Sequence, residues 1–357
     1  MSQKPSKKQK QPKKKTAGAK PSVPLLRRIA RWAAVCTVVL FAALCGGGAW
    51  YARHPPAWLE EAKGSTPAFI RAPLMYFGDR TLFMTDALGW TGHDAVYDCD
   101  DPPPAGNVFY AGKPVRVAGP APADIRTLDR GPFVVGWSDS LQHPAWVAYH
   151  VPPEARFDPG KRPSFRKDRS IAKSPTASAY SNTGYDRGHM APNRAIATRF
   201  GPEAQSQTFL MSNIAPQLPA LNRGPWRELE QRIADLWTAR WGEIWVICGT
   251  ISGTNGRSRE RLPGTLVDVP ESFWMLIISQ SDDEVRALAL ILPQSVKFDD
   301  FPVHRIVTVD ELEKATGLDL MPDLPSFLRD PLKADRPTRL WPIRLRDIFK
   351  LIMIRFV

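Results

Sequence analysis

A series of short apolar runs beginning after Gly131 constrains the fold more than any other feature of the sequence. Each run is four to eight residues long and rich in β-branched and aromatic side chains, which is typical of strands. The last two runs are separated by the five residues Gln-Ser-Asp-Asp-Glu, which predicts an antiparallel hairpin with a five-residue loop. We expect strands at residues 133–137, 146–151, 208–211, 244–251, 272–279 and 285–292.

Two helices accompany these strands. Residues 225–240 carry an apolar stripe at helical spacing, and Pro225 suits the first helical position because its missing N–H would be unpaired there. A second helix is predicted to begin after Thr308, which forms a capping box with Glu311, and to end at Gly317. The pattern therefore predicts an α+β domain over residues 131–325, with a mainly antiparallel sheet.

The flanking segments are less regular. Residues 53–130 are rich in proline and glycine, and we interpret them as an extension, either a stalk or a segment wrapped on the domain. Residues 326–357 form a C-terminal tail. Its last part, residues 343–357, mixes cations with large apolar side chains and is expected to be a helix that covers the core, with a helix on a membrane surface as the alternative.

The charge is concentrated at the N-terminus. The chain has a formal net charge of +12, and the first 31 residues contain 11 lysines and arginines and no acid. The remaining residues are therefore nearly neutral, so the surplus is not by itself a nucleic-acid footprint. We expect residues 1–31 to be a disordered basic tail in the cytoplasm that also attracts anionic lipid.

Residues 32–52 contain no charge, and about 20 apolar residues are enough to cross a bilayer. Arginines precede this run and Trp50 and Tyr51 end it, which predicts a single-pass anchor with the following domain across the membrane. A cleaved signal peptide and a buried core helix are the alternatives. The Lys-rich tail is unlike a transit peptide, which favours a bacterial inner membrane over a mitochondrial one. Beyond the run only Cys99 and Cys248 remain, and whether they pair is left open.

The segment most informative about chemistry is Asp186-Arg187-Gly188-His189. A neutral imidazole can take a proton from water near pH 7, and a guanidinium can bind phosphate oxygens in a fork. Downstream, Asn222 and Glu230 offer the oxygen ligands that Mg²⁺ prefers. Each also has an ordinary structural interpretation, Asn222 as a helix N-cap and Glu230 as a solvated helix residue.

Taken together, these segments resemble the DNA/RNA non-specific endonucleases, which include the Serratia-type nucleases and mitochondrial endonuclease G. The resemblance rests on the DRGH motif, on Asn222 with Glu230 eight residues later, and on three further segments, residues 144–149, 212–217 and 308–325. It covers about 195 residues, which is more than half of the chain.

The resemblance implies a ββα-metal core, in which a hairpin carries the DRGH motif and the next helix carries the metal ligand. His189 would be the general base, Asn222 would ligate one Mg²⁺ directly, with Mn²⁺ as a substitute, and Glu230 would hold metal-bound water. The metal would neutralise the scissile phosphate and the leaving 3′ oxygen, giving 5′-phosphate products. Asp186 would orient the site, and Arg187 would contact phosphate or support the loop.

Other implied roles are less specific. Asn213 would position His189 or the metal-bound waters, and Arg162, with Arg166 as the alternative, would contact the transition-state phosphate. The expected substrates are DNA and RNA, and a homodimer is expected from family analogy. Two other functions are carried forward: a membrane-tethered nucleic-acid-binding protein without catalysis, and a phosphodiesterase that acts on another substrate.

Overall fold

The computed structural model describes residues 85 and 87–356, apart from 91, 100–107, 118, 254–259 and 282. The predicted basic tail and the uncharged run at 32–52 therefore lie outside the described residues. Within the described part of the chain, no helix is both long and apolar enough to span a bilayer.

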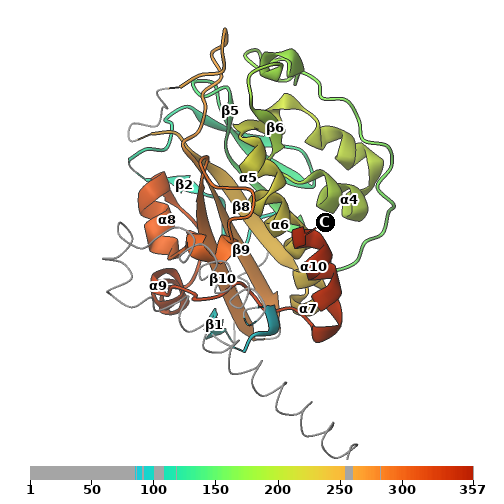
Figure 1. Cartoon of the computed structure of the whole chain (residues 1–357). Helices are drawn as coiled ribbons and strands as arrows, with labels where there is room; N and C mark the ends of the chain where they lie inside the picture. Colours follow the sequence, from blue (N-terminus) through green and yellow to red (C-terminus); the bar gives the residue numbers. More distant parts are fainter. Residues whose placement is uncertain are drawn as a thin grey trace, which may run out of the picture. The chain divides into compact units, whose positions relative to one another are not determined.

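A large antiparallel sheet forms the centre of the described fold (Figure 1). Its strand order is β1-β10-β9-β8-β5-β4-β3, and β11 pairs with β10 off this path. The strands are β1 (Ala95–Asp98), β3 (Ile125–Asp129), β4 (Phe133–Ser138), β5 (His143–Val151), β8 (Ile244–Ile251), β9 (Ser272–Ser281), β10 (Glu284–Pro293) and β11 (Ile306–Val307). The predicted α+β class with a mainly antiparallel sheet is confirmed.

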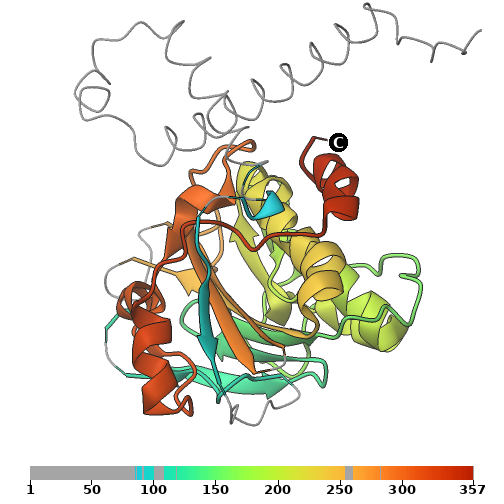
Figure 2. The ribbon, with the colours of Figure 1, turned by 90° about the horizontal axis from the view of Figure 1, so that it is seen from below.

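Helices cover both faces of this sheet (Figures 1 and 2). Each face of the sheet has its own hydrophobic cluster, and alternate residues of β5 enter different ones. Val147 and Tyr149 belong to the cluster that contains Trp226 and Leu229. Trp146 and Ala148 belong to the cluster that contains Leu312. Because both faces are buried, the central strands read in the sequence as continuous apolar runs rather than as alternating ones.

The helices that cover the face of the sheet with Val147 and Tyr149 follow one another closely in the chain. They are α4 (Asn193–Thr208), α5 (Pro219–Arg223), α6 (Pro225–Gln231), the π-helical segment η4 (Arg232–Trp237) and α7 (Thr238–Trp241). The helix expected over 225–240 is thus confirmed, with Pro225 in its first turn and a π-helical segment in its middle. On the other face lie α8 (Val309–Thr316) and α9 (Ser326–Ala334).

Two local predictions about element boundaries are confirmed and two are wrong. Thr308 and Glu311 form the capping box of α8, and Gly317 ends that helix in the left-handed region at φ 70°. Residues 208–211 are not a strand, because Thr208 ends α4 and Met211 begins the 3-10 turn η3 (Met211–Asn213). The hairpin of β9 and β10 is antiparallel as expected, but pairing continues to Ser281 and Glu284, which leaves a loop of two residues.

Segments outside 131–325 also contribute to the folded unit. Strands β1 and β3 from the predicted extension pair with β10 and β4, and β2 (Val115–Arg116) pairs with β12 (Leu318–Asp319). In the predicted tail, Leu328 and Trp341 are buried. The helix expected near the C-terminus is α10 (Ile348–Phe356), preceded by the turn η6 (Leu345–Asp347), and its Leu351 is buried in the core.

Cys99 and Cys248 do not form a disulfide with each other. Cys99 belongs to the cluster on one face of the sheet and Cys248 to the cluster on the other face. The sheet therefore separates them, and the Cys248 thiol instead donates a hydrogen bond to the Met190 carbonyl at 3.3 Å.

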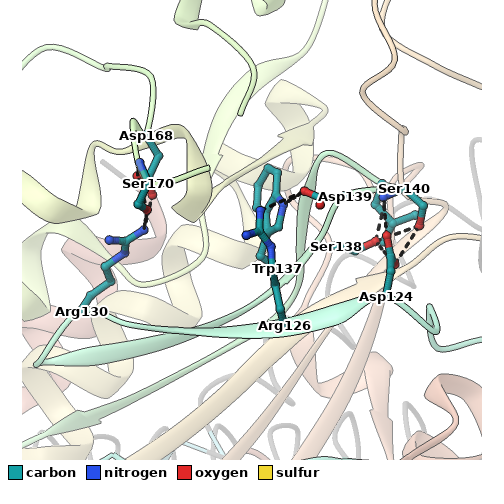
Figure 3. Close-up of polar contacts among 10 residues, drawn as sticks. Asp124, Arg126, Arg130, Trp137, Ser138, Asp139, Ser140, Asp168 and Ser170 are labelled. Atoms are coloured by element: carbon teal, nitrogen blue, oxygen red, sulfur yellow. Dashed lines mark hydrogen bonds and ion pairs between the residues drawn. The ribbon is translucent and has the colours of Figure 1, made fainter. Parts of the chain in front are cut away.

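Polar contacts join β3 and β4 to the loops around them (Figure 3). Just after β3, Arg130 donates to the buried carboxylate of Asp168, which also accepts hydrogen bonds from the backbone N–H and the hydroxyl of Ser170. Burial alone would raise the pKa of Asp168, but the hydrogen bonds from Ser170 and the charge of Arg130 hold it below its usual value. The ion pair of Arg130 and Asp168 therefore holds the loop that contains Asp168 against the end of β3.

We predict that Arg130→Gln lowers the free energy of unfolding by roughly 3 kcal/mol at pH 7, because it leaves the carboxylate of Asp168 buried without its cation. Arg126→Gln is the matched control: Arg126 pairs with Asp139 in a more exposed contact, where a loss within about 1 kcal/mol is expected. Chemical denaturation followed by tryptophan fluorescence measures both.

The pH dependence of that deficit follows from the lowered pKa of Asp168. A carboxyl with a depressed folded-state pKa contributes stability above its unfolded pKa of about 3.9 and loses it as the pH falls. The difference between Arg130→Gln and the wild type should therefore shrink near pH 3. Equal losses for Arg130→Gln and Arg126→Gln at pH 7 would contradict the assignment.

Candidate active site

The DRGH residues form the short strand β6 (Asp186–His189), which pairs antiparallel with β7 (Ile214–Gln217). The two strands are not a simple hairpin as expected, because α4 and η3 lie between them in the sequence. Gly188 leaves room for the buried side chain of Gln217, since a Cβ at position 188 would lie 2.1 Å from the Gln217 Oε1. The motif is therefore positioned by a long-range strand pair.

Asn213 fixes the end of β6. Its Oδ1 accepts from the Ala191 N–H at 2.9 Å, and its Nδ2 donates to the carbonyls of Ala191 and Thr208, both at 3.0 Å. The side chain is fully buried. Asn213 therefore acts on the backbone that follows His189, which agrees with the positioning role among the two alternatives for this residue.

His189 packs against two aromatic rings, which also contact each other with centroids 5.1 Å apart. The centroid of its imidazole is 5.3 Å from that of Phe165 and 4.9 Å from that of Phe209. Its Nε2 is buried from solvent and has no hydrogen-bond partner in the protein. Burial, followed by the charge of Arg162, lowers the pKa of His189 well below its usual value. The ring is therefore neutral at pH 7, which is the form that can accept a proton.

Asp186 organises the next turn of the site. Its carboxylate accepts a hydrogen bond from the Asn222 Nδ2 at 2.9 Å and two hydrogen bonds from Arg223, at 2.7 and 2.8 Å. Burial raises the pKa of Asp186, but the contacts with Arg223 and Asn222 outweigh it and hold the pKa below its usual value. Since the amide nitrogen of Asn222 is held by Asp186, its Oδ1 is left to accept from, or to ligate, a group in the cleft.

Glu230 lies on α6. Its Oε1 accepts from the indole N–H of Trp226 at 3.0 Å. Burial raises the pKa of Glu230 to about 8, although the Trp226 hydrogen bond and the charge of Arg162 lower it in part. A carboxyl that burial holds protonated is one that a divalent cation would bind in place of the proton, so this observation fits a metal site.

These groups line one cleft of about 500 Å³. Asp186, His189, Asn222 and Glu230 all contribute to it, so the structure brings together the predicted base and both predicted metal ligands. Five arginines and two carboxylates line it, which gives the cleft a positive charge. In the described part of the chain no three His, Cys, Asp or Glu side chains gather into a metal cluster. The arginines are Arg162, Arg187, Arg194, Arg223 and Arg227.

The structure also separates the two candidate arginines. Arg162 lines the cleft and lies over the Phe209 ring, with 5.6 Å from its guanidinium carbon to the ring centroid. Arg166 does not line it; its guanidinium donates to the Ser206 hydroxyl at 2.8 Å. Arg187 donates twice to the Ala177 carbonyl, so its contacts within the protein are those of a loop support.

Sequence reasoning missed Arg227, Gln231 and Phe165. Arg227 and Gln231 lie on α6 within one helical turn of Glu230, so the spacing along that helix could have found them. Phe165 had no such signal, because its contact with His189 depends on how the loop before β6 folds.

The sequence of this chain is similar to those of known proteins over the region that contains the cleft. Residues 114–327 match the family model described as DNA/RNA non-specific endonuclease. The chain belongs to the DNA/RNA non-specific endonuclease family. The predicted family is thus confirmed, and the chain is an enzyme of the nuclease class. The match begins 17 residues before the predicted boundary at 131, so it includes β2 and β3.

Named relatives agree with this assignment. The chain is 31% identical to a nuclease of Serratia marcescens over 219 residues, which cover 58% of this chain and 79% of the relative. It is 29% identical to a nuclease of Nostoc sp. over 211 residues (56% and 74%), and 27% identical to mitochondrial endonuclease G of Bos taurus over 216 residues (57% and 71%). The crystal structure of an EndoG/EndoGI complex shares the fold, with a TM-score of 0.50, 24% identity, and coverage of 56% of this chain and 86% of that one.

We predict that Asn213→Ala lowers both stability and turnover. It removes three hydrogen bonds and leaves the buried N–H and C=O of Ala191 without partners, at a cost of about 1–3 kcal/mol for each unpaired group. Asn213→Asp keeps an acceptor for the Ala191 N–H but cannot donate to either carbonyl, so it should be impaired as well. Thermal unfolding and the cleavage rate at a temperature where both variants are folded provide the test. Full activity of folded Asn213→Ala would contradict the positioning role.

Proposed function

We propose that the protein is a metal-dependent endonuclease that hydrolyses phosphodiester bonds of both DNA and RNA. The observation that carries this proposal is the placement of a neutral His189 in the same cleft as Asn222, Glu230 and several arginines. His189 takes a proton from the attacking water, since its ring lines the cleft and is neutral at pH 7. Arginine contacts with phosphate carry no base information, which suits a non-specific enzyme.

The metal-binding residues in this proposal are Asn222, through Oδ1, and Glu230, directly or through water. A Mg²⁺ or Mn²⁺ ion held there supplies positive charge that stabilises the phosphate and the leaving oxygen. Asp186 keeps the amide of Asn222 in one orientation by accepting from its Nδ2. The carboxyl of Glu230, which burial disfavours as an anion, gains its counter-ion from the metal.

The arginines of the cleft divide into two groups. Arg194 is paired with Asp235 and Arg223 with Asp186, and Arg187 is held by the Ala177 carbonyl. Arg162 and Arg227 have no ion pair with a carboxylate within the described residues, and the Nε of Arg227 is buried without a partner. Arg162 and Arg227 are therefore the guanidiniums left to bind substrate phosphates, Arg162 beside His189 and Arg227 from α6.

We predict that His189→Ala reduces turnover by about 10²–10⁴-fold on both plasmid DNA and RNA, because the general base is lost. EDTA should abolish cleavage by the wild type, and added Mg²⁺ should restore it. Cleavage of another phosphodiester but of neither nucleic acid would favour the alternative substrate, and tight DNA binding without any turnover would favour a receptor. Unchanged turnover of folded His189→Ala would contradict the mechanism.

A second prediction concerns the free arginine on α6. Arg227→Gln should lower kcat/KM for DNA by about 10-fold or more, the effect of losing a charge-assisted hydrogen bond. Arg194→Gln is the matched control, an arginine of the same cleft whose charge Asp235 already neutralises, and a smaller effect is expected. Steady-state kinetics at fixed ionic strength decide between them. A larger loss in Arg194→Gln would contradict the assignment.

The proposal includes the location of the enzyme. The uncharged run at 32–52, with cations before it and aromatic residues at its end, supports a single-pass anchor with a cytoplasmic N-terminus and an extracytoplasmic nuclease domain. A bacterial inner membrane suits the Lys-rich tail better than a mitochondrial one. A homodimer is proposed from family analogy alone.

The anchor predicts that the full chain stays in the membrane pellet after alkaline carbonate extraction. Replacing Val39 and Leu40 together by arginine should release it, because each arginine costs roughly 2.5–3.5 kcal/mol at the centre of a membrane helix. Immunoblotting of the pellet and the supernatant measures the distribution. Release of the wild-type chain would contradict the anchor.

A further inference from the structure

The C-terminal helix carries an apolar stripe that faces away from the domain. Leu345, Phe349 and Met353 are 72%, 68% and 42% exposed. They are spaced by four residues, so they lie on one side of the continuous turn formed by η6 and α10. On the domain side, Leu351 and Ile348 pack into the main core. A surface helix can bury only one of its sides against its own domain. The apolar stripe on the other side of α10 is therefore left exposed.

Trp90 is a further exposed apolar side chain, near the segment that leads into α10. It is 68% exposed, and the carbonyl of Gly89 before it accepts from the Arg339 Nη1 at 2.9 Å. The backbone joins the two segments directly, since the Ile343 N–H donates to the Ala87 carbonyl at 2.9 Å. A tryptophan beside large aliphatic side chains is typical of groups that sit at a lipid–water interface.

The charges around the stripe favour one kind of partner. Arg344, Arg346 and Lys350 flank it, and Arg346 and Lys350 are exposed. The one acid of residues 344–353, Asp347, is buried and paired with Lys350 at 2.9 Å. The flank of the stripe is therefore cationic, which complements anionic lipid headgroups.

The length of chain before the described residues allows the same partner. The first described residue is Thr85, and the chain therefore joins the folded unit next to the segment that leads into α10. The 32 residues between the uncharged run and Thr85 could span at most about 110 Å when fully extended. If the run is an anchor, this face of the domain lies within reach of the bilayer.

We propose that Leu345, Phe349, Met353 and Trp90 form a docking surface for an anionic lipid bilayer, which holds the nuclease domain against the membrane. This surface, which we call the α10 face, rests on the proposed membrane attachment but is distinct from the anchor. A second copy of the chain is the competing occupant of the same apolar side chains.

The test uses the full chain in vesicles of phosphatidylcholine and phosphatidylglycerol that contain a diazirine phospholipid. After illumination, mass spectrometry identifies the peptides that carry lipid adducts. We expect adducts in residues 345–353 and at Trp90, and a fall of at least ~5-fold in the triple variant Leu345→Gln, Phe349→Gln, Met353→Gln. The control is Phe327→Gln, an exposed aromatic residue on α9, which should leave these adducts unchanged.

The outcomes separate the surface from the anchor. Adducts at 345–353 without adducts at 32–52 would support the α10 face and overturn the anchor. Adducts at 32–52 alone would overturn the α10 face and leave the anchor standing. Cross-links between the α10 helices of two chains, in place of lipid adducts, would show that a second copy covers the face and would also overturn the proposal. Nuclease activity confirms that the triple variant is folded, since none of its positions lies in the cleft.

Discussion

The geometry of the site depends on the buried amide of Asn213. Its three hydrogen bonds join the end of α4 to the residues that follow His189, at the point where β6 and β7 pair. An amide can accept from one backbone N–H and donate to two carbonyls at once, which no hydroxyl or carboxylate side chain can do. Because α4 and η3 separate β6 from β7 in the sequence, no tight turn holds the two strands together. The hydrogen bonds of Asn213 hold them in place instead. The imidazole of His189 and the oxygen of Asn222 then face one cleft.

Pairing within the protein sorts the cations of this cleft into different roles. A guanidinium that is already bound to a carboxylate or a carbonyl stabilises the structure of the cleft, and one without such a partner can bind phosphate. Asp186 shows how a single carboxylate serves both purposes, since it pairs with Arg223 and also turns the Asn222 oxygen toward the cleft. The nearly neutral composition beyond the N-terminal tail thus coexists with a strongly positive site.

The sequence was sufficient for whatever depends on local patterns. Continuous apolar runs identified the central strands, the capping box identified α8, and the DRGH motif with Asn222 and Glu230 identified the family. The sequence was insufficient where the local structure depends on side-chain contacts or on segments that are distant in the chain. The run at 208–211 became a turn because Asn213 bonds the Thr208 carbonyl, and Arg162 could be separated from Arg166 only once the loop was placed over Phe209. The cysteines could not be assigned without knowing that the sheet lies between them.

The central claim is that Asn222 and Glu230 hold one divalent cation beside His189. Electron paramagnetic resonance of Mn²⁺ titrated into the full chain tests it without relying on activity. The account predicts one bound ion per chain that Mg²⁺ displaces, with affinity at least ~10-fold weaker in Asn222→Ala and in Glu230→Gln and unchanged in His189→Ala. Equal Mn²⁺ affinity in the wild type and in both ligand variants would contradict it.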